Sequence, residues 1–252
     1  MRRPILLWII LLTLAPCRGG AADLTRTGVE SILAGTTAGQ HANFAGRSLA
    51  GLDLSDLDFS GADLSGADLS DCDLRRTKLV GAKLVGTRLS RARMNLAWII
   101  GADFSHADLS GADLETLIVS AGMETHPEEA ARFVDAKLTG AKVTARFSLD
   151  DMTRADFSRL HATADMRNQS MGLIRADFSR AILNDAIFAG AELGHVNFEF
   201  AKLRGADFSG ADLSDADFSG ANLTEANLSG ATTTGANFDG ATLTSVKGFK
   251  LP

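Results

Sequence analysis

The sequence predicts an all-β solenoid, a chain wound into short coils that stack on one another, and three observations lead to this fold class. Large apolar residues recur at intervals of five, without a gap, from Phe44 to Leu114. A small residue, most often Ala, lies two positions before most of these centres, and Ser or Gly commonly follows them. The chain has 25 Gly and no Tyr, but 45% of its 252 residues are apolar, which is enough to form a core.

A period of five excludes a long helix and a long flat strand. On a helix, five residues rotate by roughly 500°, so successive centres would spread around the cylinder. On a strand, an odd period would point alternate centres to opposite faces. Within one unit, however, two residues that are two positions apart share a face, and Ser-Gly permits a turn. We therefore expect three extended residues and a corner in each unit, with stacking that buries the interior of the coils.

The units ADFSG, ADLSG, ANLTE and AKLVG resemble the pentapeptide repeat family, whose pattern is A(D/N)LXX. The resemblance spans roughly residues 42–245 and implies a right-handed quadrilateral β-helix with four pentapeptides per coil. With ~20 residues per coil and ~4.8 Å between strands, we expect roughly ten coils in a rod of ~45–50 Å. Because the family is defined by its scaffold, the resemblance implies no particular activity.

The pattern divides the chain into six segments. They are a signal peptide at 1–22, an N-terminal cap at 23–41, a first repeat tract at 42–115, an insertion loop with irregular repeats at 116–175, a second repeat tract at 176–245 and a C-terminal tail at 246–252.

The first 22 residues have the layout of a secretory signal. A basic start precedes the apolar run ILLWIILLTL, and small residues lead to a cleavage site near Ala22. The run is too short for a comfortable transmembrane helix, so we expect a periplasmic or secreted protein without a stable membrane span after cleavage. A lipoprotein signal ending at Cys17 is disfavoured, because Pro16 stands where a small residue is needed. Cleavage leaves 22 cationic and 31 acidic residues, a net charge of −9.

The middle and the two ends interrupt the repeat. The segment 115–131 shows no repeat, and Pro127 with two following acids is typical of a helix start, so we expect a loop with a short helix. It is either a tolerated surface insertion or a binding loop. Residues 29–34 would cover the first coil. At the other end, Phe249 and Leu251 would fold over the last coil, or that end would form a homodimer.

Charge argues against the best-known activity within the family. Some cytosolic members resemble B-form DNA in shape and acidity and bind type II topoisomerases, so a DNA-mimicking inhibitor or protector of such an enzyme is the alternative function. With four units per coil, positions twenty apart stack, and one predicted row reads Asp63, Lys83, Asp103. The other rows also place a cation or Trp98 in that coil, which breaks the continuous acidic surface that a mimic requires. The acidic chain also offers no typical nucleic-acid site.

The sequence predicts no catalytic, cofactor-binding or metal site. The five histidines have no metal-ligand spacing with Cys72 or with each other, and Cys72 occupies a small inward position. Several apolar residues should face outward and would suit a protein partner; they are Trp98, Ile118, Ile182, Ile187 and Phe200. The function that we predict is therefore an exported, non-enzymatic scaffold that binds an unidentified protein partner in the cell envelope.

Overall fold

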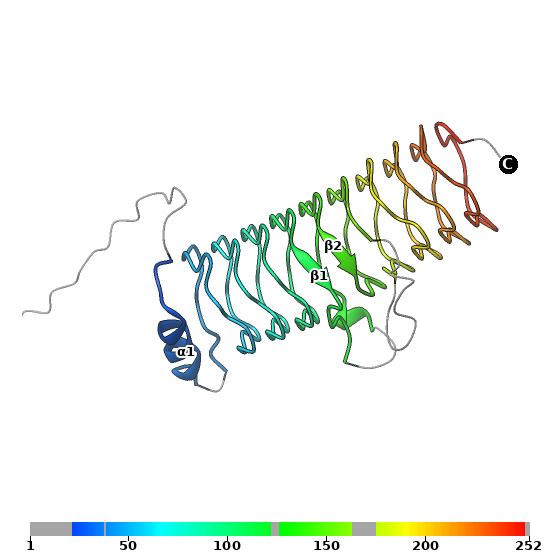
Figure 1. Ribbon diagram of the computed structural model, residues 1–252. Coiled ribbons are helices and arrows are strands. Elements are labelled where there is room, and N and C mark those ends of the chain that lie inside the picture. The colour runs from blue at the N-terminus through cyan, green and yellow to red at the C-terminus, as the bar shows by residue number, and fades with distance from the viewer. Residues whose placement is uncertain (1–21, 38, 122–125, 163–174, 250–252) are drawn as a thin grey trace, which may run out of the picture.

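The computed structural model describes residues 22–37, 39–121, 126–162 and 175–249, and it confirms the predicted right-handed quadrilateral β-helix. Figure 1 shows coils stacked in one row, with helix α1 (Arg26–Ala34) at one end and the C-terminus at the other. Residues twenty positions apart pair as parallel β-bridges through most of the stack, as Asn43 does with Asp63. The five-residue unit therefore forms one side of a square coil.

Four ladders of bridges define four faces, which we number in chain order. Face 1 begins at Asn43, face 2 at Ser48, face 3 at Asp53 and face 4 at Asp58. The ladder on face 1 is unbroken over ten rungs: Asn43, Asp63, Lys83, Asp103, Arg132, Asp151, Ile182, Lys202, Asn222 and Thr242. This number agrees with the roughly ten coils expected from the repeat.

Backbone hydrogen bonds join each coil to the next. Phe44 N donates to Asp63 O at 2.7 Å, and Asp63 N donates to Ala42 O at 2.9 Å. Each corner adds a bond within the coil, as from Ala62 N to Phe59 O at 2.9 Å. Because the ladder and corner bonds pair so many backbone groups, the stack can be both narrow and rigid.

The core contains two inward rows per face, a small residue followed by Leu or Phe. Leu predominates in the first half, whereas Phe forms two stacks in the second half. One stack lies behind face 4 and contains Phe147, Phe178, Phe198, Phe218 and Phe238; the other lies behind face 2 and contains Phe157, Phe188 and Phe208. Rings from the two stacks also meet edge to face across the interior, so aromatic side chains pack against one another throughout this part of the core.

The repeat continues through the middle of the chain with changed spacing. Asp103 pairs with Arg132, which is 29 residues on, and Arg132 pairs with Asp151 after only 19. The next coil on this face is longer again, because Asp151 pairs with Ile182 after 31 residues. The ladder nevertheless remains continuous on face 1, so the insertions do not interrupt the stack there.

The structure also refines the predicted boundary at residue 115. Strand β1 (Asp113–Glu115) pairs in parallel with β2 (Lys142–Thr144), and the repeat register then extends one unit further. Ile118 pairs with Trp98 on face 4, and Val119 is buried at the next centre. The expected short helix is a 3-10 turn, η1 (Pro127–Glu129).

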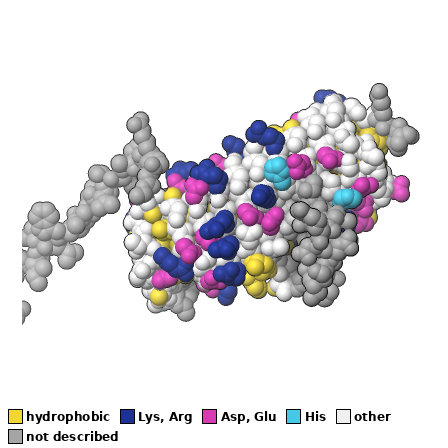
Figure 2. Space-filling view, viewed as in Figure 1, with side chains coloured by type: hydrophobic (Ala, Val, Ile, Leu, Met, Phe, Trp, Pro, Cys, Tyr) yellow, Lys and Arg dark blue, Asp and Glu magenta, His cyan; other side chains and the backbone are white. Residues whose placement is uncertain are grey.

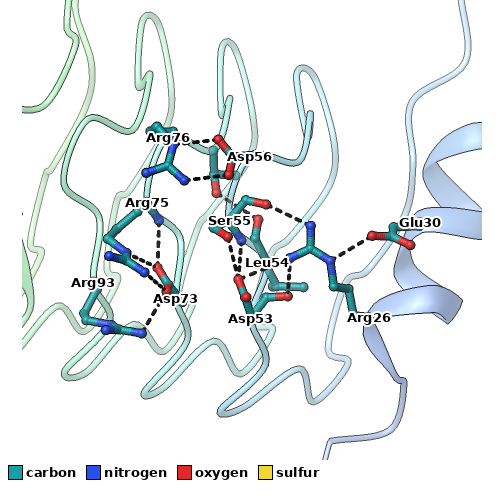
Figure 3. A network of polar contacts seen from close by, with 11 residues as sticks. Arg26, Glu30, Asp53, Leu54, Ser55, Asp56, Asp73, Arg75, Arg76 and Arg93 are labelled. Carbon is teal, nitrogen blue, oxygen red and sulfur yellow. Dashed lines mark hydrogen bonds and ion pairs between the residues drawn. The ribbon is translucent and has the colours of Figure 1, made fainter.

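Helix α1 closes the first coil, as the sequence predicts. Thr25 Oγ1 accepts a hydrogen bond from Gly28 N at 3.2 Å and caps the helix, whose Val29 is buried against the core. Arg26 donates to the carbonyl oxygens of Asp53 and Ser55, at 2.9 and 3.0 Å (Figure 3). The helix therefore covers the apolar end of the stack and satisfies edge carbonyls that have no preceding coil.

Candidate interaction surface

Face 4 is the face whose ladder is interrupted in the described part of the chain. Its bridges run through Asp58, Lys78, Trp98 and Ile118, and resume with Arg146 and Asp177. No bridge joins Ile118 to Arg146, although both residues are described. The backbone on this face therefore departs from the regular repeat between two coils.

The irregular segments border this same face. Fourteen residues separate Ile118 on face 4 from Arg132 on face 1, where a regular unit has five. On the other side, sixteen residues lead from His161 on face 3 to Asp177 on face 4. Both insertions therefore leave and rejoin the stack at the edges of face 4.

Exposed apolar side chains lie at the same place. Trp98 is 36% exposed, and Ile118, half-buried, pairs with it in the next coil. Leu96 lies at the preceding corner and is 45% exposed. Two further exposed residues, Leu96 and Val85, lie at the turns between units and were not among the outward residues predicted from the sequence, although Phe200, which was predicted, also lies at such a turn. We call Leu96, Trp98 and Ile118 the apolar patch.

The other predicted outward residues do not join this patch. Ile182 is half-buried on face 1, and Ile187 is 39% exposed on face 2 of the same coil. Phe200 is 53% exposed at a corner, where its ring covers Gly220 of the next coil. The five residues predicted as one class therefore occupy several separate positions, and only Trp98 and Ile118 are adjacent.

The first insertion is held together by Glu129 at the end of η1. The Glu129 carboxylate accepts hydrogen bonds from Ser120 Oγ, Ala121 N and His126 N, at 3.0, 3.2 and 3.3 Å. Burial alone would raise the pKa of Glu129, but these donors keep the pKa below its usual value. Glu129 O also accepts from Gly101 N at 2.8 Å, so the base of the loop is joined to the regular stack.

Acidic and basic residues alternate between coils, as predicted, and many form ion pairs. Arg88 approaches Asp68 at 3.1 Å and Arg93 approaches Asp73 at 2.8 Å, each from the following coil. Figure 2 shows cationic and acidic side chains alternating along the first half of the molecule. The stacked positions therefore form charge pairs in place of a continuous acidic surface.

Corner residues form further pairs that sequence reasoning missed. Arg76 makes a two-pronged contact with Asp56 at 2.6 and 2.7 Å, shown in Figure 3, and Arg91 makes the same contact with Asp71. Both pairs join residues twenty apart, so the stacking rule applied to corner positions would have found them. The Arg76 guanidinium holds the pKa of Asp56 below its usual value.

No enzyme-like site emerges from the titratable side chains that the structure describes. Cys72 is buried, its Sγ donates to Leu49 O at 3.0 Å, and burial raises the pKa of its thiol to about 12. The described histidines lie apart along the rod; His161, for example, contacts Glu192 at 2.9 Å. Among described residues, no group of three His, Cys, Asp or Glu side chains is arranged to hold a metal ion.

Two predictions fall on parts of the chain that the structure does not describe. The signal sequence and Cys17 lie within residues 1–21, outside the described residues, as does Leu251. Within the described ranges, no helix has the length and apolar character needed to cross a membrane.

The repeat and the square coil together define the class of protein, and a family model confirms it. The pentapeptide repeat model matches residues 40–76, 76–115, 173–210, 191–230 and 221–247, with eight copies. These matches cover more than half of the chain, so this protein belongs to the pentapeptide repeat family.

Solved structures of other pentapeptide repeat proteins are similar at low identity. HetL, involved in heterocyst differentiation regulation in the cyanobacterium Nostoc sp. strain PCC 7120, is 26% identical; the match covers 89% of this chain and 97% of HetL, with a TM-score of 0.38. Rfr23 from the cyanobacterium Cyanothece 51142 is 24% identical over 57% of this chain and 86% of Rfr23, with a TM-score of 0.39. QnrB1, a plasmid-mediated fluoroquinolone resistance protein, is 20% identical over 77% of this chain and 84% of QnrB1, with a TM-score of 0.38. No curated protein matches this chain.

Proposed function

We propose that this protein is an exported, non-enzymatic scaffold that binds a protein partner in the cell envelope through the apolar patch on face 4. One observation carries the proposal: Trp98, which is 36% exposed, and the half-buried Ile118 lie beside the interruption of the face-4 ladder, where the first insertion leaves the stack. Regular coils support this surface on the side of Asp58 and Lys78.

The rigidity of the support favours binding. Trp98 N donates to Thr77 O and Ile99 N donates to Ile118 O, both at 2.9 Å, so backbone bonds fix both patch strands. A preorganised surface loses little conformational freedom when a partner binds. Large aromatic side chains such as Trp98 are also the residues that most often dominate binding energy.

The chemistry around the patch indicates the character of the partner. Lys78 and Arg146 continue face 4 on either side of the patch, but Lys78 lies 3.7 Å from Asp58 and Arg146 lies 3.8 Å from Asp177. Since these cations already have acidic neighbours, they would add little binding energy to a partner with an acidic surface. We therefore expect recognition of an apolar protein surface, with binding that changes little as salt concentration rises.

Export is supported by the sequence of residues 1–22 and is compatible with the first described contacts. Asp23, the first residue after the proposed cleavage, donates its backbone N–H to Ser48 O at 2.7 Å and accepts from Ser48 N at 2.8 Å. After cleavage this nitrogen becomes the terminal amino group, which can still donate to the same carbonyl. The cap would thus remain in place on the mature chain.

Site-specific photo-cross-linking in intact cells tests the partner proposal. A photoreactive residue at position 98 should give a defined cross-link in the envelope fraction, whereas the same residue at the exposed position 200 should not. Ile118→Asp in the position-98 variant should abolish the product. Equal products at both positions, or a product that persists with Ile118→Asp, would contradict a partner site at the patch.

A supercoiling assay with the purified protein tests the alternative function. Purified protein should leave the DNA supercoiling activity of a type II topoisomerase unchanged, because charge pairs interrupt its acidic ladders. Inhibition or protection at stoichiometric concentration would favour the DNA-mimic alternative.

We also propose a homodimer through the C-terminal end, because the inward residues of the last described coil are only half-buried. Phe238, Leu243 and Phe249 pack against the core but retain exposure that equivalent residues in inner coils lack. A second copy stacked on this end would bury them. Analytical ultracentrifugation should show a dimer that Leu243→Asp converts to a monomer; a monomeric wild-type chain would exclude the dimer.

A further inference from the structure

Asp150 is a buried acid in the interior of the solenoid. It occupies the small inward position two residues before the centre Met152, where most units have Ala, and its exposed fraction is 0%. Its Oδ1 accepts a hydrogen bond from Ala131 N at 2.8 Å. Its Oδ2 is also buried and has no hydrogen-bond partner among the described residues.

The bond to Ala131 explains why a polar side chain is present here. In regular units the equivalent N–H donates to the carbonyl three residues earlier, as Ala62 N does to Phe59 O. Ala131 instead follows η1, where the insertion rejoins the stack, and its N–H donates to the Asp150 carboxyl group. Asp150 therefore fixes the returning end of the first insertion to the following coil.

The charged groups around Asp150 all lie on the outer surface. Arg132 and Asp151 pair on face 1, Asp103 lies beside Arg132, and Asp135 and Arg154 form an ion pair at the adjacent corner. On the inner side, its stacked neighbours are Ala131 in the preceding coil and Ala181 in the following one. No inward cation among the described residues is therefore available to neutralise an ionised Asp150.

We propose that Asp150 is a pH-sensitive latch: its neutral carboxyl group keeps the end of the first insertion seated, and its ionisation releases that segment from the stack. The carboxyl group gives its proton to solvent when the segment opens, and the resulting carboxylate is hydrated outside the core. This proposal concerns the insertion itself and does not depend on the identity of any partner.

Electrostatics gives the direction of the effect. Burial raises the pKa of Asp150 well above its usual value, and the single hydrogen bond from Ala131 opposes burial only in part. A group whose pKa is raised in the folded state stabilises that state fully at low pH, and this contribution is lost as pH rises through the raised value. The latch should therefore be closed in mild acid and open more often in base.

Hydrogen exchange tests the latch on the intact chain. Exchange of a peptide covering 128–135 should be measured from pH 5 to pH 9 for wild type and Asp150→Asn, which keeps an oxygen acceptor for Ala131 N but cannot ionise. Because this peptide has the same sequence in both proteins, its intrinsic exchange rate cancels in their ratio. Between the ordinary carboxyl pKa of ~3.9 and the raised value, the wild-type opening constant should increase relative to the variant by up to about tenfold per pH unit, and it should level off above the raised value.

Two internal controls keep the result interpretable. Asp151→Asn, a change at the adjacent outward residue, should behave as wild type, and the distant segment 206–218 should show no comparable increase in opening. If Asp150→Asn does not fold, the wild-type comparison of 128–135 with 206–218 remains a complete test. A constant ratio between the two segments, or between the two proteins, from pH 5 to pH 9 would overturn the latch.

Discussion

Truncation of Phe198 to Ala should severely weaken the second half of the rod. Phe198 is 0% exposed and lies in the centre of the aromatic core. Its ring stacks on Phe178 and Phe218, with centroids 5.4 and 4.9 Å away, and meets Phe188 and Phe208 edge to face at 5.7 and 5.8 Å. No other single truncation in this region removes a more central ring.

The magnitude follows from burial and from the rigidity of the neighbours. Phe→Ala changes in cores cost about 3–5 kcal/mol, and the value depends on how far the cavity can collapse. The coils on both sides of Phe198 are held by backbone bonds, such as Phe198 N to Asp217 O at 2.7 Å, so little collapse is available. The lost ring pairs contribute ~0.5–1.5 kcal/mol each beyond burial. We therefore expect the upper part of the range, about 4–5 kcal/mol.

Equilibrium unfolding in guanidinium chloride, followed by far-ultraviolet circular dichroism, measures this loss. Phe200→Ala is the matched control, because the same residue type two positions away is 53% exposed; its cost should be below ~1 kcal/mol. Phe198→Leu should fall between the two, at about 1–1.5 kcal/mol, because Leu fits the same inward position in neighbouring units. Equal losses for Phe198→Ala and Phe200→Ala would refute the inward assignment of the repeat centres.

Three further predictions address the thiol, the acidic ladders and the corners. The Cys72 thiol, with its pKa raised to about 12 by burial, should resist alkylation at pH 8 until the chain unfolds; rapid labelling of the native protein would contradict its burial. The hydrogen bond from the Arg75 side chain lowers the pKa of Asp73. Ionised Asp73 therefore stabilises the folded chain above its unfolded pKa of ~3.9, and this stabilisation is lost as pH falls. Asp73→Asn should consequently make the stability depend less on pH between pH 5 and pH 2. An unchanged acid transition would exclude that contribution. Gly220→Ala should lower the thermal unfolding temperature more than Gly210→Ala. Both glycines have a φ near +65°, but only at Gly220 would the new Cβ meet the Phe200 ring. The opposite order would contradict the corner geometry.

The periodic part of the molecule could be predicted from the sequence because every unit has the same five-residue pattern. A small residue, an outward residue and a large residue fix the direction of every side chain, and the twenty-residue coil then places Asp68 beside Arg88. The cap at α1 was also predictable, since an open coil exposes apolar side chains and a short amphipathic segment precedes it. These are local rules, and repetition makes them reliable.

The irregular features were less accessible for physical reasons. The interruption of face 4 depends on the face from which each insertion leaves the stack. The sequence does not reveal this face, because a coil of 19 residues lies between two longer coils and the five-residue register shifts there. Asp150 lies two residues before Met152, a position that the repeat makes inward, but an acidic side chain argues against burial. Only the structure shows that it accepts a hydrogen bond from Ala131, at the end of the insertion.

The mature N-terminus in the native host tests the proposed exported scaffold most directly. Cells would be fractionated, and the terminus of the protein in each fraction identified by mass spectrometry. We predict a chain that begins at Asp23 in the exported fraction, with the cap residues that contact Ser48 intact. An intact Met1 in the soluble cytosol would contradict export and would favour the topoisomerase alternative.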